Sequence, residues 1–135
     1  MRGWIGVDLD GTLANYEGWR GAEYIGDPIA AMVERVKAWR ADGKEVRIFT
    51  ARVHPLAYIA PNGDYIAISD AGHAEIGYAC RVVNRIHEWM TIHLGEVLPV
   101  TCCKDYGMVE MWDDRAVRVK ANTGEPCCGQ AGSAP

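Results

Sequence analysis

The sequence predicts an α/β fold, with an open, mostly parallel, Rossmann-like sheet and helices on both of its faces. Short apolar segments that resemble buried strands alternate along the chain with segments of helical periodicity, and this alternation is typical of a parallel sheet. Polar and acidic residues follow directly where several strand-like segments end. The 135 residues, 49% of them hydrophobic, suffice for one domain with a core of its own.

The first half of the chain predicts a strand, a helix and a second strand. Residues 4–7 are apolar and prone to β-structure. Asp27-Pro28 predicts a helix start, because an acidic N-cap followed by proline favours the first turn. Apolar residues then recur at helical spacing until Gly43 ends the helix, and residues 45–50 form the second strand. Such a unit implies parallel strands and a right-handed crossover.

The second half of the chain predicts a hairpin, a long helix and further strands. Asn62-Gly63 separates two apolar runs within residues 53–72, which favours a small hairpin. Helical spacing predicts a helix over residues 74–94, ended by glycine. Further strands are expected at residues 97–103, 108–112 and 117–119.

Composition divides the chain at about residue 121. Residues 1–120 carry all the predicted strands and helices, whereas residues 121–135 are rich in glycine, proline, serine and cysteine without periodicity. We therefore expect one domain over residues 1–120, with a small insertion at about residues 53–72, followed by a poorly packed tail.

Charge and cysteine content exclude some classes of protein. Eighteen acids against 14 bases give a formal net charge of −4, which argues against a protein that works mainly by covering nucleic acid with positive charge. Five cysteines without a secretory signal predict reduced thiols in the cytoplasm. The pairs Cys102-Cys103 and Cys127-Cys128 match no zinc-knuckle spacing, so free thiols are favoured over a zinc site. No apolar run is long enough for a transmembrane helix.

Four carboxylates follow two of the predicted strands, Asp8 and Asp10 after the first, and Asp113 and Asp114 after the one at residues 108–112. Parallel sheets bind ligands outside the carboxyl ends of their strands. Residues two apart on an extended chain point the same way, so Asp8 and Asp10 repel each other unless a cation or a proton lies between them. Mg²⁺ suits such oxygen ligands, and we expect it as the cofactor.

Groups that can bind phosphate accompany these carboxylates. Gly11-Thr12 continues the first loop, and its backbone N–H groups can face an anion. Thr50 offers a hydroxyl after the second strand, and Lys104 offers a positive charge after the third. The whole set supplies a nucleophile, an acid–base group, a metal cage and phosphate donors, which are the parts that phosphoryl transfer needs.

Each of these residues also has an ordinary structural interpretation. Aspartate and glycine are common in turns, threonine is common in strands, and a lysine is usually a solvated surface charge. Asp113-Asp114 could cap a helix that begins near Arg115. The joint placement of the set at successive strand ends favours the functional interpretation.

Four short motifs occur in the order found in the haloacid dehalogenase (HAD) superfamily of phosphatases. The run DLDGT that begins at Asp8 resembles the first motif, and the run FTAR around Thr50 is similar to the second. Lys104 stands where the lysine of the third motif is expected, and the run WDDRA that contains Asp113 resembles the acidic fourth motif. The resemblance covers about residues 1–120.

The resemblance implies a Mg²⁺-dependent phosphomonoester hydrolase. Asp8 would attack phosphorus and form an aspartyl-phosphate, while Asp10 would protonate the leaving group and later activate water. A carboxylate oxygen of Asp8, the backbone carbonyl of Asp10, and Asp113 would hold the metal, with Asp114 ligating through water or orienting the site. The residues expected to hold the phosphoryl group are Gly11, Thr12, Thr50, Ala51 and Lys104.

The chain is shorter than larger members of the superfamily, whose cap domains add many tens of residues. Residues 14–27, a predicted flap, and the insertion are available to cover the site, so we expect a nearly capless, open site. The candidates for substrate contact are Tyr16, Trp19, Arg20, Arg52 and His54, and each of these can equally pack locally or face solvent.

Three functions are compatible with the sequence. The leading one is hydrolysis of a small-molecule or nucleotide phosphate monoester. An open site also admits a nucleic-acid 3′-end phosphatase or a nucleotidase. A non-catalytic module that binds Mg²⁺ and phosphate for a partner is a further alternative. The sequence indicates no membrane partner and no particular oligomer.

Overall fold

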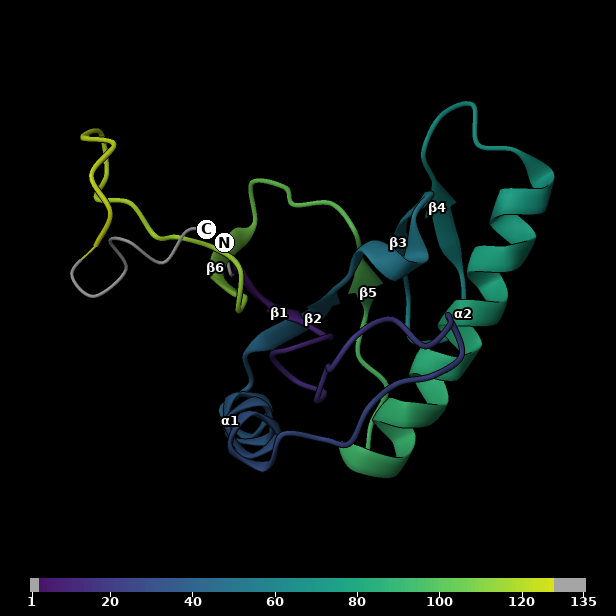
Figure 1. Ribbon diagram of the computed structural model, residues 1–135, viewed down its shortest axis with the longest axis horizontal. Coiled ribbons are helices and arrows are strands. Elements are labelled where there is room, and N and C mark those ends of the chain that lie inside the picture. The colour runs from purple at the N-terminus through teal and green to yellow at the C-terminus, as the bar shows by residue number, and fades with distance from the viewer. Residues whose placement is uncertain (1–2, 128–135) are drawn as a thin grey trace.

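Six strands, two α-helices and one short 3-10 helix make up the computed structural model over residues 3–127, the part of the chain that it describes (Figure 1). The helices are α1 (Ala30–Ala41), α2 (His73–His93) and the 3-10 helix η1 (Ala51–Val53). The strands are β1 (Trp4–Asp8), β2 (Glu45–Phe49), β3 (Leu56–Ile59), β4 (Tyr65–Ala67), β5 (Val100–Thr101) and β6 (Met108–Trp112). The predicted α/β class is therefore confirmed.

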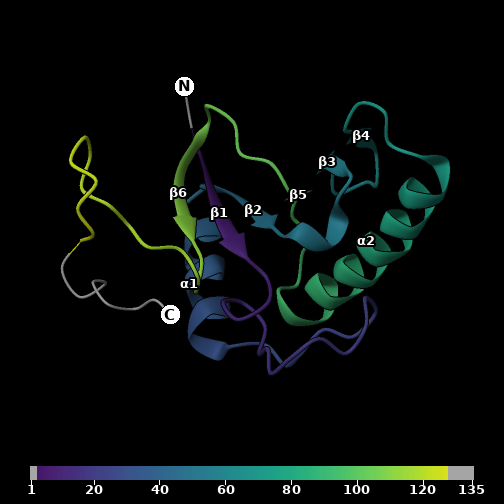
Figure 2. The same ribbon diagram turned by 45° about the horizontal axis from the view of Figure 1, so that its top comes forward.

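The strands form one mixed sheet in the order β4-β3-β5-β2-β1-β6. β1 pairs in parallel with both β2 and β6, and β2 pairs in parallel with β5. β3 pairs antiparallel with both β4 and β5. The strands β6, β1 and β2 run side by side in two views (Figures 1 and 2). Their carboxyl ends therefore meet at one edge, where the sequence analysis expects a ligand.

One face of the parallel strands carries the main hydrophobic core. Ile5 and Val7 of β1 stand beside Val46 and Ile48 of β2 in the strand register, and all four side chains are buried. This cluster holds the strand ends in fixed positions relative to both helices. Its helical members include Met32, Val33 and Val36 of α1 and Ala79, Val82, Val83, Ile86, Trp89 and Met90 of α2.

The predicted layout with helices on both faces of the sheet is not confirmed. Residues of α1 and α2 belong to the same buried cluster. The crossovers from β1 to β2 and from β2 to β5 step in the same direction across the sheet, and right-handed crossovers of that kind carry their helices to the same face. On the other face of β2, the Arg47 guanidinium lies over the rings of Trp4 and Tyr58, at 4.4 and 5.0 Å from their centroids.

α1 begins later than the sequence predicts. Its first residue is Ala30, so Asp27-Pro28 does not start the helix. The backbone N–H of Asn15 donates to the carbonyl of Asp27 at 2.7 Å, and Pro28 forms an isolated bridge with Ala14. Pairing with the chain that leaves β1 therefore holds this segment extended, and it overrides the local capping signal.

The insertion at residues 53–72 extends the sheet. Asn62-Gly63 lies in the turn between β3 and β4, which confirms the predicted hairpin. The side chain of Asn62 stabilises this turn by accepting a hydrogen bond from the N–H of Asp64 at 2.9 Å. Because β3 pairs with β5, the hairpin lies at the far edge of the sheet from β6.

The later strands differ in length from those predicted. The strand expected at residues 97–103 is reduced to the two residues of β5. Pro99 has no N–H to donate, and the hydroxyl of Thr101 accepts a hydrogen bond from the N–H of Cys103 at 3.0 Å, which replaces strand pairing there. β6 matches the prediction. Residues 117–119 form no strand in the described chain, where Val119 makes an isolated bridge to Pro126.

The first part of the predicted tail is exposed. Residues 121–126 are solvent-accessible and include a turn in which the N–H of Lys120 donates to the carbonyl of Glu125 at 2.8 Å. Residues 128–135, the rest of the predicted tail, lie outside the described residues. Neither α-helix in the described chain combines the length and the apolar character that crossing a membrane requires.

Candidate active site

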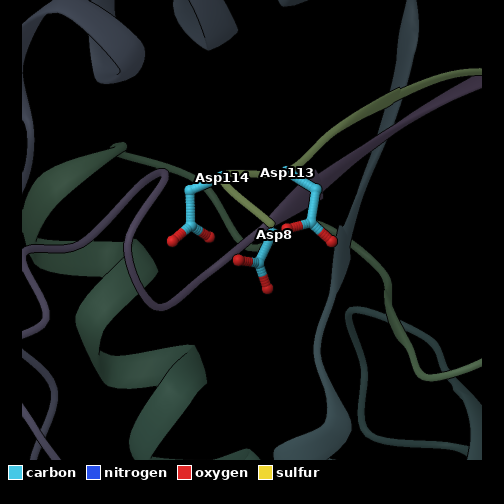
Figure 3. A group of neighbouring side chains, drawn as sticks. All are labelled: Asp8, Asp113 and Asp114. Carbon is cyan, nitrogen blue, oxygen red and sulfur yellow. The ribbon is translucent and has the colours of Figure 1, made fainter. Parts of the chain in front are cut away.

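Three carboxylates meet at the carboxyl ends of β1 and β6. Asp8 is the last residue of β1, and Asp113 and Asp114 directly follow β6, which is its parallel neighbour. One carboxylate oxygen from each residue lies within 4.8 Å of the other two, and Figure 3 shows the three side chains gathered at one point. Strand pairing therefore brings together residues that lie more than a hundred positions apart in the sequence.

The electrostatics of this acidic cluster favour a cation. Burial is the largest of the causes that raise the pKa of Asp8 from 3.8 to about 7. The charge of Asp113, a hydrogen bond with Asp114, and the charges of Asp114 and Asp10 raise it further. Carboxylates that repel one another in this way are oxygen donors of the kind that Mg²⁺ prefers. The donor set therefore fits a magnesium ion.

The loop after β1 brings Gly11 and Thr12 against Asp114. Gly11 has a φ of +89°, and a Cβ at this position would lie 2.5 Å from Oδ2 of Asp114, so the close approach requires glycine. The N–H of Asp114 donates to Oγ1 of Thr12 at 3.0 Å. The same hydroxyl lies 3.5 Å from Asp8 Oδ2 and from Asp114 Oδ1. Thr12 thus links the two strand-end loops, and contact of this loop with phosphate stays a prediction.

The carboxylate of Asp10 is held by Arg52. Nε of Arg52 donates to Oδ2 of Asp10 at 2.7 Å, and Nη2 donates to Oδ1 at 2.8 Å. The side chain of Arg52 is 6% exposed and that of Asp10 is 20% exposed. A two-point ion pair of this kind fixes the orientation of both groups. The roles that the sequence analysis gave these residues, acid–base catalysis for Asp10 and substrate contact for Arg52, stay predictions.

Arg52 is itself held by the loop between β1 and α1. Nη1 of Arg52 donates to the carbonyl of Ala22 at 2.9 Å, and the guanidinium carbon lies 5.0 Å from the ring centroid of Trp19. The loop is attached to α2 by a hydrogen bond of 2.9 Å from the ring N–H of Trp89 to the carbonyl of Gly26. The position of the loop and the orientation of Asp10 therefore depend on each other.

Thr50 and Ala51 follow β2, the other neighbour of β1. Thr50 is buried, and its backbone N–H donates to the carbonyl of Thr101 at 2.9 Å. Its hydroxyl accepts a hydrogen bond from the N–H of Arg52 at 3.2 Å, which stabilises the start of η1. The local turn therefore sets the direction of both Thr50 and Arg52, and contact of Thr50 and Ala51 with a phosphoryl group stays a prediction.

An open cleft of about 350 Å³ lies in front of Asp8. This volume is in the range of small-molecule binding sites. The cleft brings together most of the residues that the sequence analysis named, and no residue of the insertion at 53–72 lines it. The lining residues are Asp8, Asp10, Tyr16, Trp19, Thr50, Ala51, Arg52, Asp113 and Arg115.

Six residues named from the sequence do not line this cleft, namely Gly11, Thr12, Asp114, Lys104, Arg20 and His54. Lys104 is exposed and lies beyond the end of β5, in the irregular segment that leads to β6. Arg20 lines a neighbouring cavity, where its guanidinium lies 5.2 Å from the ring centroid of Tyr24. His54 is exposed at the end of η1. The role of Lys104 in phosphate binding stays a prediction.

Comparisons of the chain with models of protein families, with curated proteins and with solved structures found no match. The interpretation of the site therefore rests on its own geometry and on the motifs in the sequence.

Proposed function

We propose that this chain is a Mg²⁺-dependent phosphomonoester hydrolase of the HAD type that acts through an aspartyl-phosphate on Asp8. The observation that carries the proposal is the convergence of Asp8, Asp113 and Asp114 at the ends of two adjacent parallel strands, beside an open cleft. The order of the four motifs supports it. The parallel pairing of β5, β2, β1 and β6 supports a Rossmann-like domain for this enzyme.

The acidic cluster supports a magnesium site. The proposed ligands are carboxylate oxygens of Asp8 and Asp113 and the backbone carbonyl of Asp10, with Asp114 ligating through water or orienting the site. When bound, the cation would supply positive charge that offsets the clustered carboxylates and stabilises the phosphoryl oxygens in the transition state. The hydrogen bond from Asp114 to Thr12 and the absence of a side chain at Gly11 keep Asp114 beside the cluster.

In the first half-reaction, a carboxylate oxygen of Asp8 forms a bond to phosphorus while the bond between phosphorus and the leaving oxygen breaks. Protonated Asp10 gives its proton to the leaving oxygen, so that the product leaves as an alcohol and Asp10 becomes a carboxylate. The two-point contact with Arg52 orients the Asp10 side chain at the edge of the cleft, and one of its two hydrogen bonds must open for that carboxyl group to carry the proton.

In the second half-reaction, the Asp10 carboxylate takes a proton from water, and the oxygen of that water attacks phosphorus. The bond between phosphorus and Asp8 breaks, inorganic phosphate leaves, and the free Asp8 carboxylate and protonated Asp10 are restored. The reaction therefore consumes one water and needs no other reactant.

The phosphoryl oxygens would be held by hydroxyl and N–H groups of the strand-end loops. Thr50 and Ala51 line the cleft, and Arg115 adds a positive charge to its wall. The resemblance assigns a phosphate contact to Lys104 as well. Lys104 is exposed and does not line the cleft, so its contact with the phosphoryl group rests on the resemblance alone.

The proposal is tested by the hydrolysis of p-nitrophenyl phosphate by the full chain, first stripped of metal with EDTA and then supplied with Mg²⁺. We expect turnover only with Mg²⁺, and a loss of roughly a thousandfold or more in Asp8→Asn, because the amide cannot act as the nucleophile. Asp42→Asn is the matched control. Asp42 is an exposed aspartate before β2, at the opposite end of the strands from the site.

A metal-independent reaction, or equal rates in the two variants, would contradict the proposal. Binding of vanadate or phosphate with Mg²⁺, without turnover of any member of a broad panel of phosphate monoesters, would identify the chain as a non-catalytic binding module.

A further inference from the structure

The cleft in front of Asp8 adjoins a second cavity along the loop between β1 and α1. The two cavities share Asp10, Tyr16 and Arg52 as walls. On its other side the second cavity is lined by Arg20 and Tyr24. The second cavity is small, about 40 Å³, so a ligand with its phosphate at Asp8 would pass over these shared walls and place most of its bulk further along the loop.

A third cavity adjoins the second and ends on α2. It shares Arg20 and Tyr24 with the second cavity, and its far wall is formed by Tyr78 and Arg81 of α2. Figure 1 shows the loop between β1 and α1 reaching α2, where Nε of Arg85 donates to a loop carbonyl at 3.0 Å. The second and third cavities, with the walls Arg20, Tyr24, Tyr78 and Arg81, are called the Tyr–Arg groove below.

Each arginine of the Tyr–Arg groove lies over a tyrosine ring. The guanidinium carbon of Arg20 is 5.2 Å from the ring centroid of Tyr24, and that of Arg81 is 5.5 Å from the ring centroid of Tyr78. Both rings are 47% exposed. Cation–π contact restrains the guanidinium groups, while the exposed parts of the tyrosine rings remain free to contact a planar ligand.

Exposed aromatic rings are concentrated along this path. Of the six large exposed aromatic side chains in residues 3–127, four line the cleft or the Tyr–Arg groove, and Tyr65 and Tyr106 lie elsewhere. Such a gathering of exposed rings gains nothing from core packing and is typical of a binding surface. The four rings are those of Tyr16, Trp19, Tyr24 and Tyr78.

We infer that the substrate is the terminal phosphate of a single-stranded nucleic acid, whose adjoining nucleotides lie in the Tyr–Arg groove. Aromatic rings and guanidinium planes hold unpaired bases by stacking, without reading their sequence. Arginine also binds the backbone phosphates that come with those bases. This inference rests on the proposed function, since it assigns the cleft at Asp8 to the terminal phosphate.

The side-chain types of the groove, and not its net charge, favour a nucleic acid over a phosphopeptide. Arg20 and Arg81 are accompanied by Glu17 and Glu23 in the walls, and Arg85 lies against the carbonyl of Glu23. With Asp10 and Arg52 included, the walls carry three acidic and three basic residues and are balanced in charge, in a chain whose net charge is −4. Val82, the large aliphatic residue of these walls, is buried, so the groove offers a ligand mainly aromatic rings and guanidinium groups.

Direct binding is measured by fluorescence anisotropy with a labelled single-stranded DNA of about eight nucleotides, enough for one small binding surface, carrying a terminal phosphate. Oligonucleotides with a 3′-phosphate, with a 5′-phosphate and with no phosphate show which end of the strand is bound, and a mononucleotide and a phosphopeptide serve as competitors.

We expect Tyr78→Ala and Arg81→Ala each to weaken DNA binding by roughly five- to tenfold, with affinity falling as salt is added. Tyr106→Ala and Lys37→Ala, both exposed and outside the groove, should leave binding unchanged.

Kinetics separate this inference from the proposed function. The inference predicts a higher kcat/KM for the phosphorylated oligonucleotide than for a mononucleotide, with a preference that shrinks in Tyr78→Ala and Arg81→Ala. Turnover of aryl phosphate without such a preference, a preference that survives both substitutions, or tighter binding of the phosphopeptide would overturn the inference and leave the phosphatase assignment intact. Absence of turnover on every phosphate monoester would overturn the proposed function, and the substrate assignment with it.

Discussion

Arg52 contacts three groups from different parts of the chain, the Asp10 carboxylate, the Ala22 carbonyl and the Trp19 ring. Its side chain is almost fully buried, so water cannot replace these contacts without rearrangement. We therefore regard Arg52 as a positioning residue for Asp10, which acts on the reaction through the orientation of that carboxyl group.

Arg52→Ala should slow the reaction in a way that depends on the leaving group. An alkyl phosphate needs a proton from Asp10 as its bond to phosphorus breaks, whereas dinitrophenyl phosphate has a leaving group that departs without one. We expect kcat/KM to fall about a hundredfold for the alkyl phosphate and only severalfold for the aryl phosphate. Arg52→Lys should lie between, because lysine offers a point charge in place of the two-point contact. Steady-state kinetics with the two substrates measures the difference.

The matched control is Arg40→Ala, which removes another arginine in a two-point pair with a carboxylate, Glu96, on the exposed surface. This variant should retain the wild-type kcat/KM for both substrates. Equal losses with the two leaving groups in Arg52→Ala would mean that Arg52 stabilises the fold without positioning Asp10.

Single residues were predictable where the strand ends decide their position. Asp8, Asp113 and Asp114 converge because β1 and β6 are parallel neighbours, and the sequence places each acid directly after its strand. The pair between Asp10 and Arg52 spans 42 positions and depends on the direction of side chains in two loops, which no spacing specifies. Lys104 lies in an irregular segment without periodicity, so its place outside the cleft lining could not be predicted.

Elements were predictable where their signals are local. The apolar runs of β1, β2 and β6, the Asn62-Gly63 turn and the helical spacing of α2 all lead to the elements observed. The predicted start of α1 was wrong, because the bridge between Pro28 and Ala14 holds this segment extended and overrides the capping signal of Asp27-Pro28. The predicted placement of helices on both faces of the sheet was not confirmed. The face that a helix covers depends on the direction of its crossover, and that direction follows from the order of the strands in the sheet, which the sequence pattern does not give.

The loop between β1 and α1 depends on α2 through Trp89. This residue is 1% exposed, and its ring N–H donates to the carbonyl of Gly26 at 2.9 Å. A Cβ at Gly26 would overlap the carbonyl oxygen of Asn15, so the two ends of the loop lie close together at this point. Trp89 therefore holds the segment that carries Tyr16 and Trp19 to the cleft.

Trp89→Phe should destabilise the protein by about 1–2 kcal/mol, because it leaves the carbonyl of Gly26 without its partner while keeping an aromatic ring in the core. The free energy of unfolding in urea measures this loss. Turnover should also fall, since the loop that contacts Arg52 becomes less restrained. Trp39→Phe is the control: this half-buried tryptophan packs edge-on against Trp112 at 5.2 Å. An equal loss of stability in the two variants would contradict a specific role for the Trp89 hydrogen bond.

At the scale of the whole molecule, four of the 18 acidic residues of the chain stand at the site. The formal charge of −4 equals the number of carboxylates at Asp8, Asp10, Asp113 and Asp114. Asp10 is paired with Arg52, whereas one carboxylate oxygen from each of the other three lies within 4.8 Å of the others. The stability of the metal-free protein should therefore respond to pH and to Mg²⁺ through this cluster.

The sign of that response follows from Asp8, whose pKa is raised from 3.8 to about 7 by burial, by the charge of Asp113 and by the other nearby carboxylates. The folded state then binds the Asp8 proton more tightly than the unfolded state does. The resulting stabilisation is fully present below about pH 4 and is lost as pH rises through about 7.

Asp8→Asn carries an uncharged amide at every pH and therefore resembles the protonated residue. In EDTA, its free energy of unfolding should match that of the wild type near about pH 4 and exceed it increasingly toward about pH 8. Mg²⁺ should stabilise the wild type most at the upper end of this range, where Asp8 is ionised, and should stabilise Asp8→Asn less. Urea unfolding of both proteins across the range, with EDTA and with Mg²⁺, measures these differences. Parallel pH profiles in EDTA would contradict the coupling, because they would mean that ionising Asp8 costs the folded protein nothing.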